Sequence, residues 1–332
     1  MTSTPRSEGN APELRPELAA PPGAAVPGAG LKRAIRPLIV GVGAVFVALA
    51  TWDLASRWEP GTLSISAPLV AAALLPLVVG TFAQGFGWIA LLGAMTGRRP
   101  RTLPGLVLYL DSQLGRYMPG KVGLPAVRMA GADRVGAPPM TVGVSVFVEM
   151  LSWLAVGCTL GFALLYATNA HAAGVLSLLG RYGLPLLAAS IVGLVALLVV
   201  DRRHLPPGIR ARLAVGERGP LVPAVLPGFH VAYWATWALH GHLVTWAVTG
   251  DPGAALASPG LFILGTVLGF LAAFAPAGVG VREAVFAAGL APVIGSAPAL
   301  AAALLSRALS IVADVLAWGL ARAAALARAR RG

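Results

Sequence analysis

The chain has 332 residues, of which 57% are hydrophobic and only 11% are charged, and its formal net charge is +12. A soluble domain has about 25% charged residues. This composition therefore excludes a soluble domain and indicates an integral membrane protein. The basic residues lie in short segments between apolar runs, as the positive-inside rule describes, so we expect no nucleic-acid partner. The apolar runs lack the period-2 alternation of strands, and we therefore predict helices.

Residues 1–31 are rich in Pro, Ala, Gly and Glu and have no apolar period, so they predict a disordered cytosolic tail. We expect a transmembrane domain over 32–325 and a basic cytosolic tail over 326–332. Apolar runs of about 20 residues can cross a hydrocarbon core of roughly 30 Å. The predicted spans are 35–55, 68–95, 140–168, 183–200, 227–249 and 298–321.

Two further apolar runs, 103–119 and 259–275, begin with Pro-Gly-Leu and end at a proline followed by glycines. The segments after them, about 124–137 and 281–295, are too short for a second crossing. Proline ends a helix and glycine permits turns, so we predict two re-entrant hairpins made of broken helices. The predicted helix-break residues are Pro119, Gly120, Gly123, Pro276, Gly278 and Gly280.

The two broken regions belong to an internal repeat. The stretch Pro104–Leu124 shares with Pro259–Val281 the order P-G-L, L-G and P-x-x-V-G, and Ser145–Trp153 aligns with Ser310–Trp318. We place the repeats at about 68–168 and 227–325. Arginine-rich loops put both termini in the cytosol of a bacterial-type inner membrane and give the halves opposite topology. The predicted fold is an all-α polytopic membrane protein with an inverted repeat and two re-entrant broken helices.

Ionisable residues gather beside the breaks and within the spans, where they are costly and usually face a cavity. We interpret them as a chamber for an anionic head group, in which arginine and lysine bind phosphate and the carboxylates orient them or accept a basic group. The alternative is that the charges only join helices, for example as Glu149–Arg307 or Arg116–Asp314 pairs. The candidate substrate-binding residues are Arg116, Lys121, Arg282, Arg307, Glu149, Glu283 and Asp314.

Other motifs carry little chemistry. The pair His240 and His242 has no third metal ligand nearby in the sequence, so packing is the favoured interpretation. The sequence has no H-E-x-x-H and no phosphate-binding G-x-x-x-x-G-K. We therefore expect no metal, no cofactor and no catalytic residue, and transport that is downhill or coupled to an ion or to a partner enzyme.

Two motifs resemble those of a known family. The residues 115–123, GRYMPGKVG, and 275–284, APAGVGVREA, resemble the paired signatures of the lysylphosphatidylglycerol synthase transmembrane region, a flippase-like module. The resemblance covers about 35–325 and implies movement of a phospholipid or a polyprenyl-linked lipid between leaflets. It carries over to Arg116, Pro119, Gly120, Gly280, Arg282 and Glu283.

The chain also departs from that family. The full-length synthases have a soluble aminoacyl-transferase domain that this sequence lacks, so we expect no lysyl transfer. The first half departs from a G-x-x-R pattern, because Leu124, Pro125 and Ala126 follow Gly123 and Arg128 comes later. Two alternatives stay open: an intramembrane enzyme that uses a buried carboxylate, and a scaffold subunit for a lipid-modifying synthase or a glycosyltransferase.

Overall fold

The computed structural model describes residues 65–113, 123–168, 176–204, 206–213, 219–220, 222–272 and 278–331. In this part of the chain all regular elements are helices, apart from an isolated bridge between Asp201 and Pro220. The long helices are α2 (Ala67–Thr96), α6 (Pro139–Ala167), α7 (Leu176–Val199), α9 (Val225–Thr249) and α12 (Ser296–Ala329). The short ones are α3 (Thr102–Gln113), α4 (Gly123–Ala130), α5 (Ala132–Val135), η4 (Arg202–His204), α8 (Pro207–Leu213), η5 (Ala254–Ala257), α10 (Ser258–Leu271) and α11 (Val281–Ile294).

Five helical segments are long and apolar enough to cross a membrane: Ala67–Thr96, Pro139–Ala167, Tyr182–Val199, Ala254–Leu271 and Ser296–Ala329. Four of them match the predicted spans 68–95, 140–168, 183–200 and 298–321. The protein is therefore an all-α, multi-pass membrane protein, as the composition predicted. The predicted span 35–55 lies outside the described residues.

The five apolar segments are not the same set as the predicted spans. The run 227–249 forms a helix of 25 residues, α9, which is not among the five apolar segments. Its histidines and tryptophans lower its hydropathy, and His230, Trp234, Trp237 and His240 are buried against other helices instead of facing lipid. Conversely, η5 and α10 together have the length and apolarity of a span, although we predicted this segment as part of a re-entrant hairpin.

Prolines and glycines in the sequence set many of the helix ends. Helices α2, α6 and α10 have proline in the first turn, where its missing N–H costs no hydrogen bond. Glycines with positive φ follow α2, α5 and α9, namely Gly97 (φ 66°), Gly136 (φ 68°) and Gly250 (φ 71°). At the other end of the chain, α12 continues through Ala329, so the predicted basic tail begins as the last turn of this helix.

The packing of the helices repeats between the two halves. The first half packs α2 on α3 and on α6, α3 on α4, and α4 on α6. The second half packs α9 on α10 and on α12, α10 on α11, and α11 on α12 in the same order. Across the halves, α6 contacts α9 and α10, just as α12 contacts α2 and α3. The duplication predicted from sequence is thus present in the packing, with α2 against α9 at its centre.

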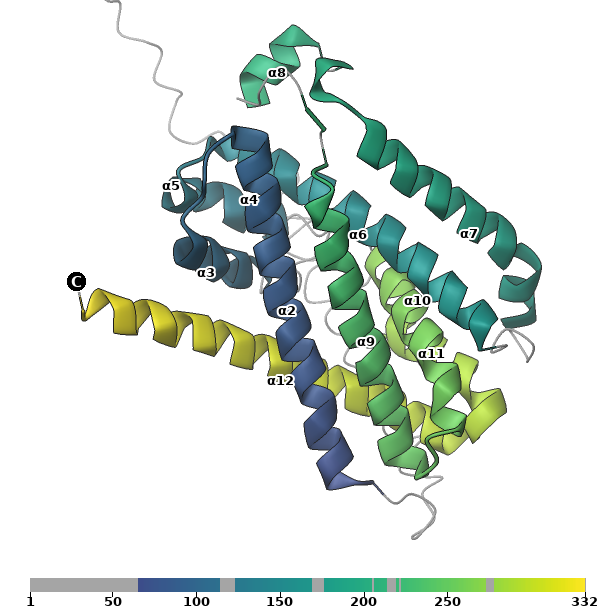
Figure 1. Cartoon of the computed structure of the whole chain (residues 1–332). Coiled ribbons are helices and arrows are strands. Elements are labelled where there is room, and N and C mark those ends of the chain that lie inside the picture. The colour runs from purple at the N-terminus through teal and green to yellow at the C-terminus, as the bar shows by residue number, and fades with distance from the viewer. Residues whose placement is uncertain are drawn as a thin grey trace, which may run out of the picture.

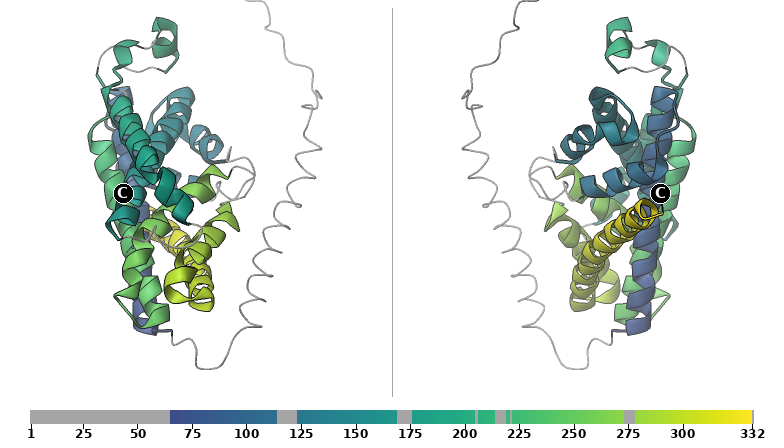
Figure 2. Two further views of the ribbon diagram at one scale, coloured as in Figure 1. Left: turned by 90° about the vertical axis from the view of Figure 1, so that its right-hand side faces the viewer. Right: turned by 90° about the vertical axis from the view of Figure 1, so that its left-hand side faces the viewer.

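Helix α7 explains how the second half is inverted. In Figure 1, α2 and α9 lie side by side and run in opposite directions, and α7, which connects α6 to the second half along the chain, crosses the molecule on the outer side of α6. A half that crosses twice, through α2 and α6, ends on the side where it began, so one further crossing starts the second half on the opposite side. Helix α7 packs chiefly on α6 and exposes Leu184, Val192 and Val199. Figure 2 shows the two short-helix pairs, α3–α4 and α10–α11, on the same side of α2 and α9.

Small residues let these helices approach closely, as is usual in membranes where lipid supplies no hydrophobic drive for association. A Cβ on Gly260 of α10 would lie 2.7 Å from the Leu165 backbone nitrogen and 2.9 Å from the Gly161 carbonyl oxygen of α6. The buried face of α12 carries mainly alanine and serine at spacings of three and four residues. The larger Val312, Val315 and Leu320 of the same helix are exposed. Close backbone contact therefore joins the second half to the first.

Because α2 and α9 run in opposite directions, the short-helix pairs that follow them begin near opposite ends of the molecule, and this predicts a labelling pattern. Arg99 precedes α3, Pro252 precedes α10, and both residues are exposed. With Cys158 first replaced by serine, cysteine at Pro252 should react with an impermeant maleimide on intact cells, and cysteine at Arg99 should react only after permeabilisation. We expect this because arginine-rich loops remain in the cytosol. Reaction of both positions from one side would contradict the inverted arrangement.

Candidate functional site

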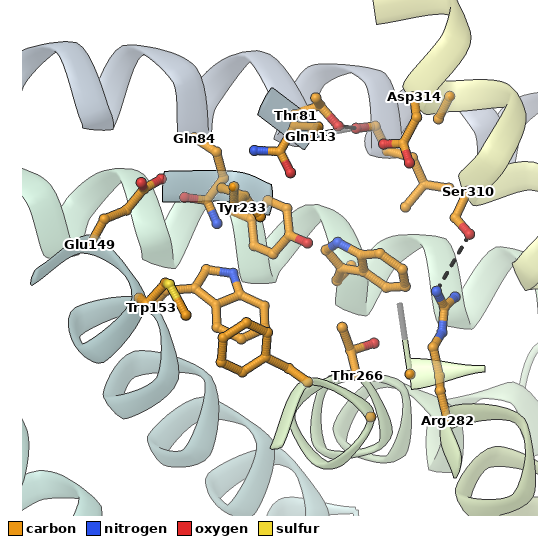
Figure 3. A pocket seen from close by; sticks show the side chains of 18 of the residues that line it. Thr81, Gln84, Gln113, Glu149, Trp153, Tyr233, Thr266, Arg282, Ser310 and Asp314 are labelled. Carbon is orange, nitrogen blue, oxygen red and sulfur yellow. Dashed lines mark hydrogen bonds between the residues drawn. The ribbon is translucent and has the colours of Figure 1, made fainter. Parts of the chain in front are cut away.

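A cavity of about 160 Å³ lies between the two halves. This volume is well above the roughly 10–15 Å³ that one water molecule needs. Its walls come from α2, α3, α4 and α6 of the first half and from α9, α10, α11 and α12 of the second. Trp153, Tyr233, Trp237 and Phe270 supply aromatic surface, and Figure 3 shows Glu149 at one side of the cavity and Arg282 at the other. The lining ionisable residues are Arg128, Glu149, Arg282, Arg307 and Asp314.

The first half contributes Arg128, which is 1% exposed. Its guanidinium lies over two rings, 4.6 Å from the centroid of Trp88 and 4.4 Å from that of Tyr109. Its Nε donates to the Ser112 Oγ at 2.9 Å, and its Nη1 donates to the Glu149 Oε2. Cation–π contacts in a dry site contribute about 2 kcal/mol each, so the rings, the hydroxyl and the carboxylate together hold this arginine in one orientation.

The second half contributes Arg282 in a similar setting. Its guanidinium lies 4.5 Å from the centroid of Trp237 and 5.2 Å from that of Phe286. Its Nη2 donates to the Ser306 Oγ at 2.7 Å, and its Nη1 lies 3.4 Å from the Ser310 Oγ. Each half therefore presents one arginine that is stacked between aromatic rings and bound by serine.

A buried chain of hydrogen bonds runs from the Ala73 carbonyl through His240 and Ser306 to Arg282. The His240 Nδ1 lies 2.8 Å from the Ala73 carbonyl oxygen, which can only accept, so Nδ1 carries a proton. In the neutral ring the Nε2 then accepts from the Ser306 hydroxyl at 2.9 Å, and the Ser306 Oγ accepts from Arg282. His240 thus positions a serine. Within the described part of the chain, no group of three potential ligands that could bind a metal includes it.

The carboxylates have partners that the sequence did not reveal. Glu149 pairs with Arg128, so the alternative Glu149–Arg307 pair is wrong. Arg307 instead donates from Nε to the Glu283 Oε1 at 2.8 Å. The Glu283 Oε2 also accepts the Gly280 backbone N–H at 2.7 Å. The anion at the start of α11 is therefore Glu283 itself.

The second break has the glycine conformations that its sequence predicts. Gly278 and Gly280 have φ of 69° and 86°, which other residues rarely adopt. Helix α10 ends at Leu271, earlier than the predicted end at 275, and Ala272 already has ψ of 81°.

The structure brings most of the described candidates to this one place. Glu149, Arg282, Arg307, Asp314 and Gly278 line the cavity. Glu283 is 1% exposed and bound to Arg307, while Gly123 begins α4 and Gly280 precedes α11. The remaining candidates lie outside the described residues: Arg116, Pro119, Gly120, Lys121 and Pro276.

Arg128 is the site residue that our sequence analysis missed, because it lies beyond the place that the G-x-x-R pattern gives to an arginine. When Gly123 is aligned with Gly280, Pro125 takes the place of Arg282, and Arg128 follows three residues later. Three residues are nearly one helical turn, so Arg128 projects from a neighbouring part of the same helix face. Two features of the sequence could have identified Arg128. It lies one helical turn beyond the expected place, and Glu149, within a span, needs a cationic partner.

The fold and the site define a class: an all-α, multi-pass membrane protein with two similarly packed halves and, between them, a cavity lined by aromatic and charged side chains. Comparison with models of known protein families and with curated proteins found no match for this chain.

Proposed function

We propose that this protein binds the anionic head group of a membrane lipid in the cavity between its halves and moves that head group between the leaflets. The observation that supports this most is the set of three arginines, Arg128, Arg282 and Arg307, around one cavity inside an apolar bundle. A charged side chain at the centre of a helix costs about 2.5–3.5 kcal/mol to insert, so such residues mark substrate pathways by default.

The balance of charge facing the cavity favours an anion. Three guanidinium groups line it, against the carboxylates of Glu149 and Asp314. The third carboxylate, Glu283, lies behind Arg307. The planar guanidinium can offer two parallel hydrogen bonds to one phosphate, and stacking on a ring leaves the edges of the plane available for donation. A lipid phosphate fits this chemistry, either as a phospholipid or as a polyprenyl-linked lipid.

Transport would follow from alternating exposure of the cavity. Helices α4 and α11 follow the two breaks and carry Arg128 and Arg282, so each half would present its arginine to the head group from its own side. The acyl chains would stay in lipid while the head group crosses. The resemblance of residues 115–123 and 275–284 to the flippase-like module supports the same function, in an inner membrane with cytosolic termini.

A transport assay tests the proposal. The purified protein is reconstituted into vesicles that contain a fluorescently tagged phospholipid with either a phosphatidylglycerol or a phosphatidylcholine head group, and movement between leaflets is measured by quenching from outside. We expect the protein to speed movement of the anionic lipid, and to do so more than for the zwitterionic one. Rates equal to those of protein-free vesicles, for these lipids and for a polyprenyl phosphate, would contradict transport and favour a scaffold subunit.

A further inference from the structure

A second cleft lies outside the central cavity, between the beginning of α3 and the end of α12. Its volume is about 780 Å³. Its lining comes from the start of α3 and the residues just before it, from Arg134 and from the last turns of α12. We call it the α3–α12 groove. None of its lining residues belongs to the central cavity, so the groove has to be explained separately.

The lining of the groove combines an apolar wall with cationic groups. Leu103, Pro104, Val107 and Ala325 are buried or half-buried and form the apolar part. Arg101 and Arg328 are exposed and come from opposite sides, one at the start of α3 and one in the last turn of α12. A ligand that fits this lining has both an anionic group and an apolar part.

The charge of the groove is only partly balanced. Asp111 of α3 accepts from Arg322 of α12 at 2.7 Å, from Arg134 at 3.2 Å and from the Trp318 Nε1 at 3.0 Å. This carboxylate therefore joins α3 to α12 and is already saturated with donors. Among the described residues no carboxylate forms an ion pair with Arg101 or Arg328.

The groove also lies where α12 changes from apolar to basic. Leu316 and Leu320 of this helix are 42% and 57% exposed, as lipid-facing residues are, and Leu326 is 63% exposed. Arginines occur at 322, 328, 330 and 331, after Leu320 and on both sides of Leu326. A change from exposed leucine to arginine within about two turns marks the boundary between hydrocarbon and head groups.

We propose that the α3–α12 groove binds one anionic phospholipid of the leaflet at this end of the molecule. Its phosphate would lie between Arg101 and Arg328, with Arg134 nearby, and an acyl chain would follow the apolar wall. A basic pocket between membrane helices is a recurrent recognition site for such lipids. Because α3 belongs to the first half and α12 to the second, the bound lipid would join the two halves from outside. This site is independent of the proposed transport.

Native mass spectrometry of the full chain in mild detergent tests the site, with phosphatidylglycerol or phosphatidylcholine added at several concentrations. The test variant combines Arg101→Gln and Arg328→Gln. The matched control combines Arg330→Gln and Arg331→Gln, which also removes two positive charges, in this case just after the end of α12 and outside the lining. Both variants keep the central cavity, so a difference between them reports on the groove alone.

We expect wild-type protein and the control to hold one more phosphatidylglycerol than the test variant does, and to be stabilised by it against heat. Each interfacial arginine contributes about 1 kcal/mol toward an anionic lipid, so the test variant should bind roughly 10-fold to 30-fold more weakly. Phosphatidylcholine should neither bind nor stabilise to the same extent. Inorganic phosphate should not displace the lipid at matched concentration, because the apolar wall adds affinity for the chains.

Equal binding by the test variant and the wild type would overturn the proposal. Equal loss in the test and control variants would replace the site with a diffuse surface attraction, which also overturns it. Displacement by phosphate alone would show an anion site with no use for the acyl chain. Circular dichroism and size-exclusion profiles of both variants establish that they fold, which exposed arginines should permit.

Discussion

Replacing Arg282 with glutamine is expected to stop movement of anionic lipid while the protein still folds and inserts. Glutamine loses the positive charge, the Nη2 donor to Ser306 and the stacking on Trp237 and Phe286. Removing one partner of a buried charge-assisted contact costs about 2–5 kcal/mol, so the rate should fall on the order of 100-fold or more. Tagged phosphatidylglycerol in reconstituted vesicles provides the measurement.

Lysine at the same position separates charge from shape. Arg282→Lys keeps the charge but lacks the planar fork and the stacking surface, so we expect an intermediate rate. Arg203→Gln is a control, because Arg203 is exposed in η4 and outside the cavity. A normal rate in Arg282→Gln would show that this arginine only supports packing.

The adjacent Glu283 makes a double variant informative. If Arg282 served only to neutralise Glu283, then Arg282→Gln with Glu283→Gln should recover activity. The structure gives Glu283 other partners, Arg307 and the Gly280 N–H. The double variant therefore leaves Arg307 without its carboxylate in a buried place, which costs about 3–5 kcal/mol. We expect it to be inactive and less stable than Arg282→Gln alone, and full recovery would leave the transport proposal without its main residue.

Sequence reasoning located the helices well because the bilayer imposes a length and an apolarity on each crossing. The runs 68–95 and 140–168 became α2 and α6 with ends that agree within one residue. The run 227–249 likewise became α9, Val225–Thr249, although its histidines and tryptophans, several of them buried against other helices, keep it out of the set of five apolar segments. Internal repetition predicted the paired short helices, since Pro-Gly-Leu and V-G recur in the same order.

Which arginine meets which carboxylate could not be predicted from the sequence. In the alignment of the two repeats Glu149 corresponds to Asp314, and both residues line the cavity. Yet the partner of Glu149, Arg128, is displaced by nearly one turn from its expected position, and only packing of α4 on α6 brings the two together. Likewise, His240 behind Ser306 depends on α9 and α12 lying side by side, a relation between segments that a linear pattern does not contain.

Replacing Gly278 with alanine should be among the most destabilising single changes in the described part of the chain. Its φ of 69° is left-handed, and a Cβ there would lie 2.7 Å from the carbonyl oxygen and 2.9 Å from the Cα of Gly269. The left-handed φ costs an alanine about 1–2 kcal/mol. The clash of its Cβ with Gly269 adds roughly 1–3 kcal/mol, because a backbone cannot rotate away as a side chain can.

Gly250 separates these two causes, because its φ is 71° and nothing lies within 4 Å of a Cβ built on it. Gly250→Ala should lose about 1–2 kcal/mol of unfolding free energy, and Gly278→Ala should lose about 2–5 kcal/mol. Thermal unfolding in one detergent compares them. Gly278→Ala should also slow lipid movement, because Gly269 and Gly278 line the cavity and α11 with Arg282 starts three residues later. Equal losses of stability would mean that the chain at Gly269 yields to a methyl group, so that the close approach of α10 to the break does not fix the position of Arg282.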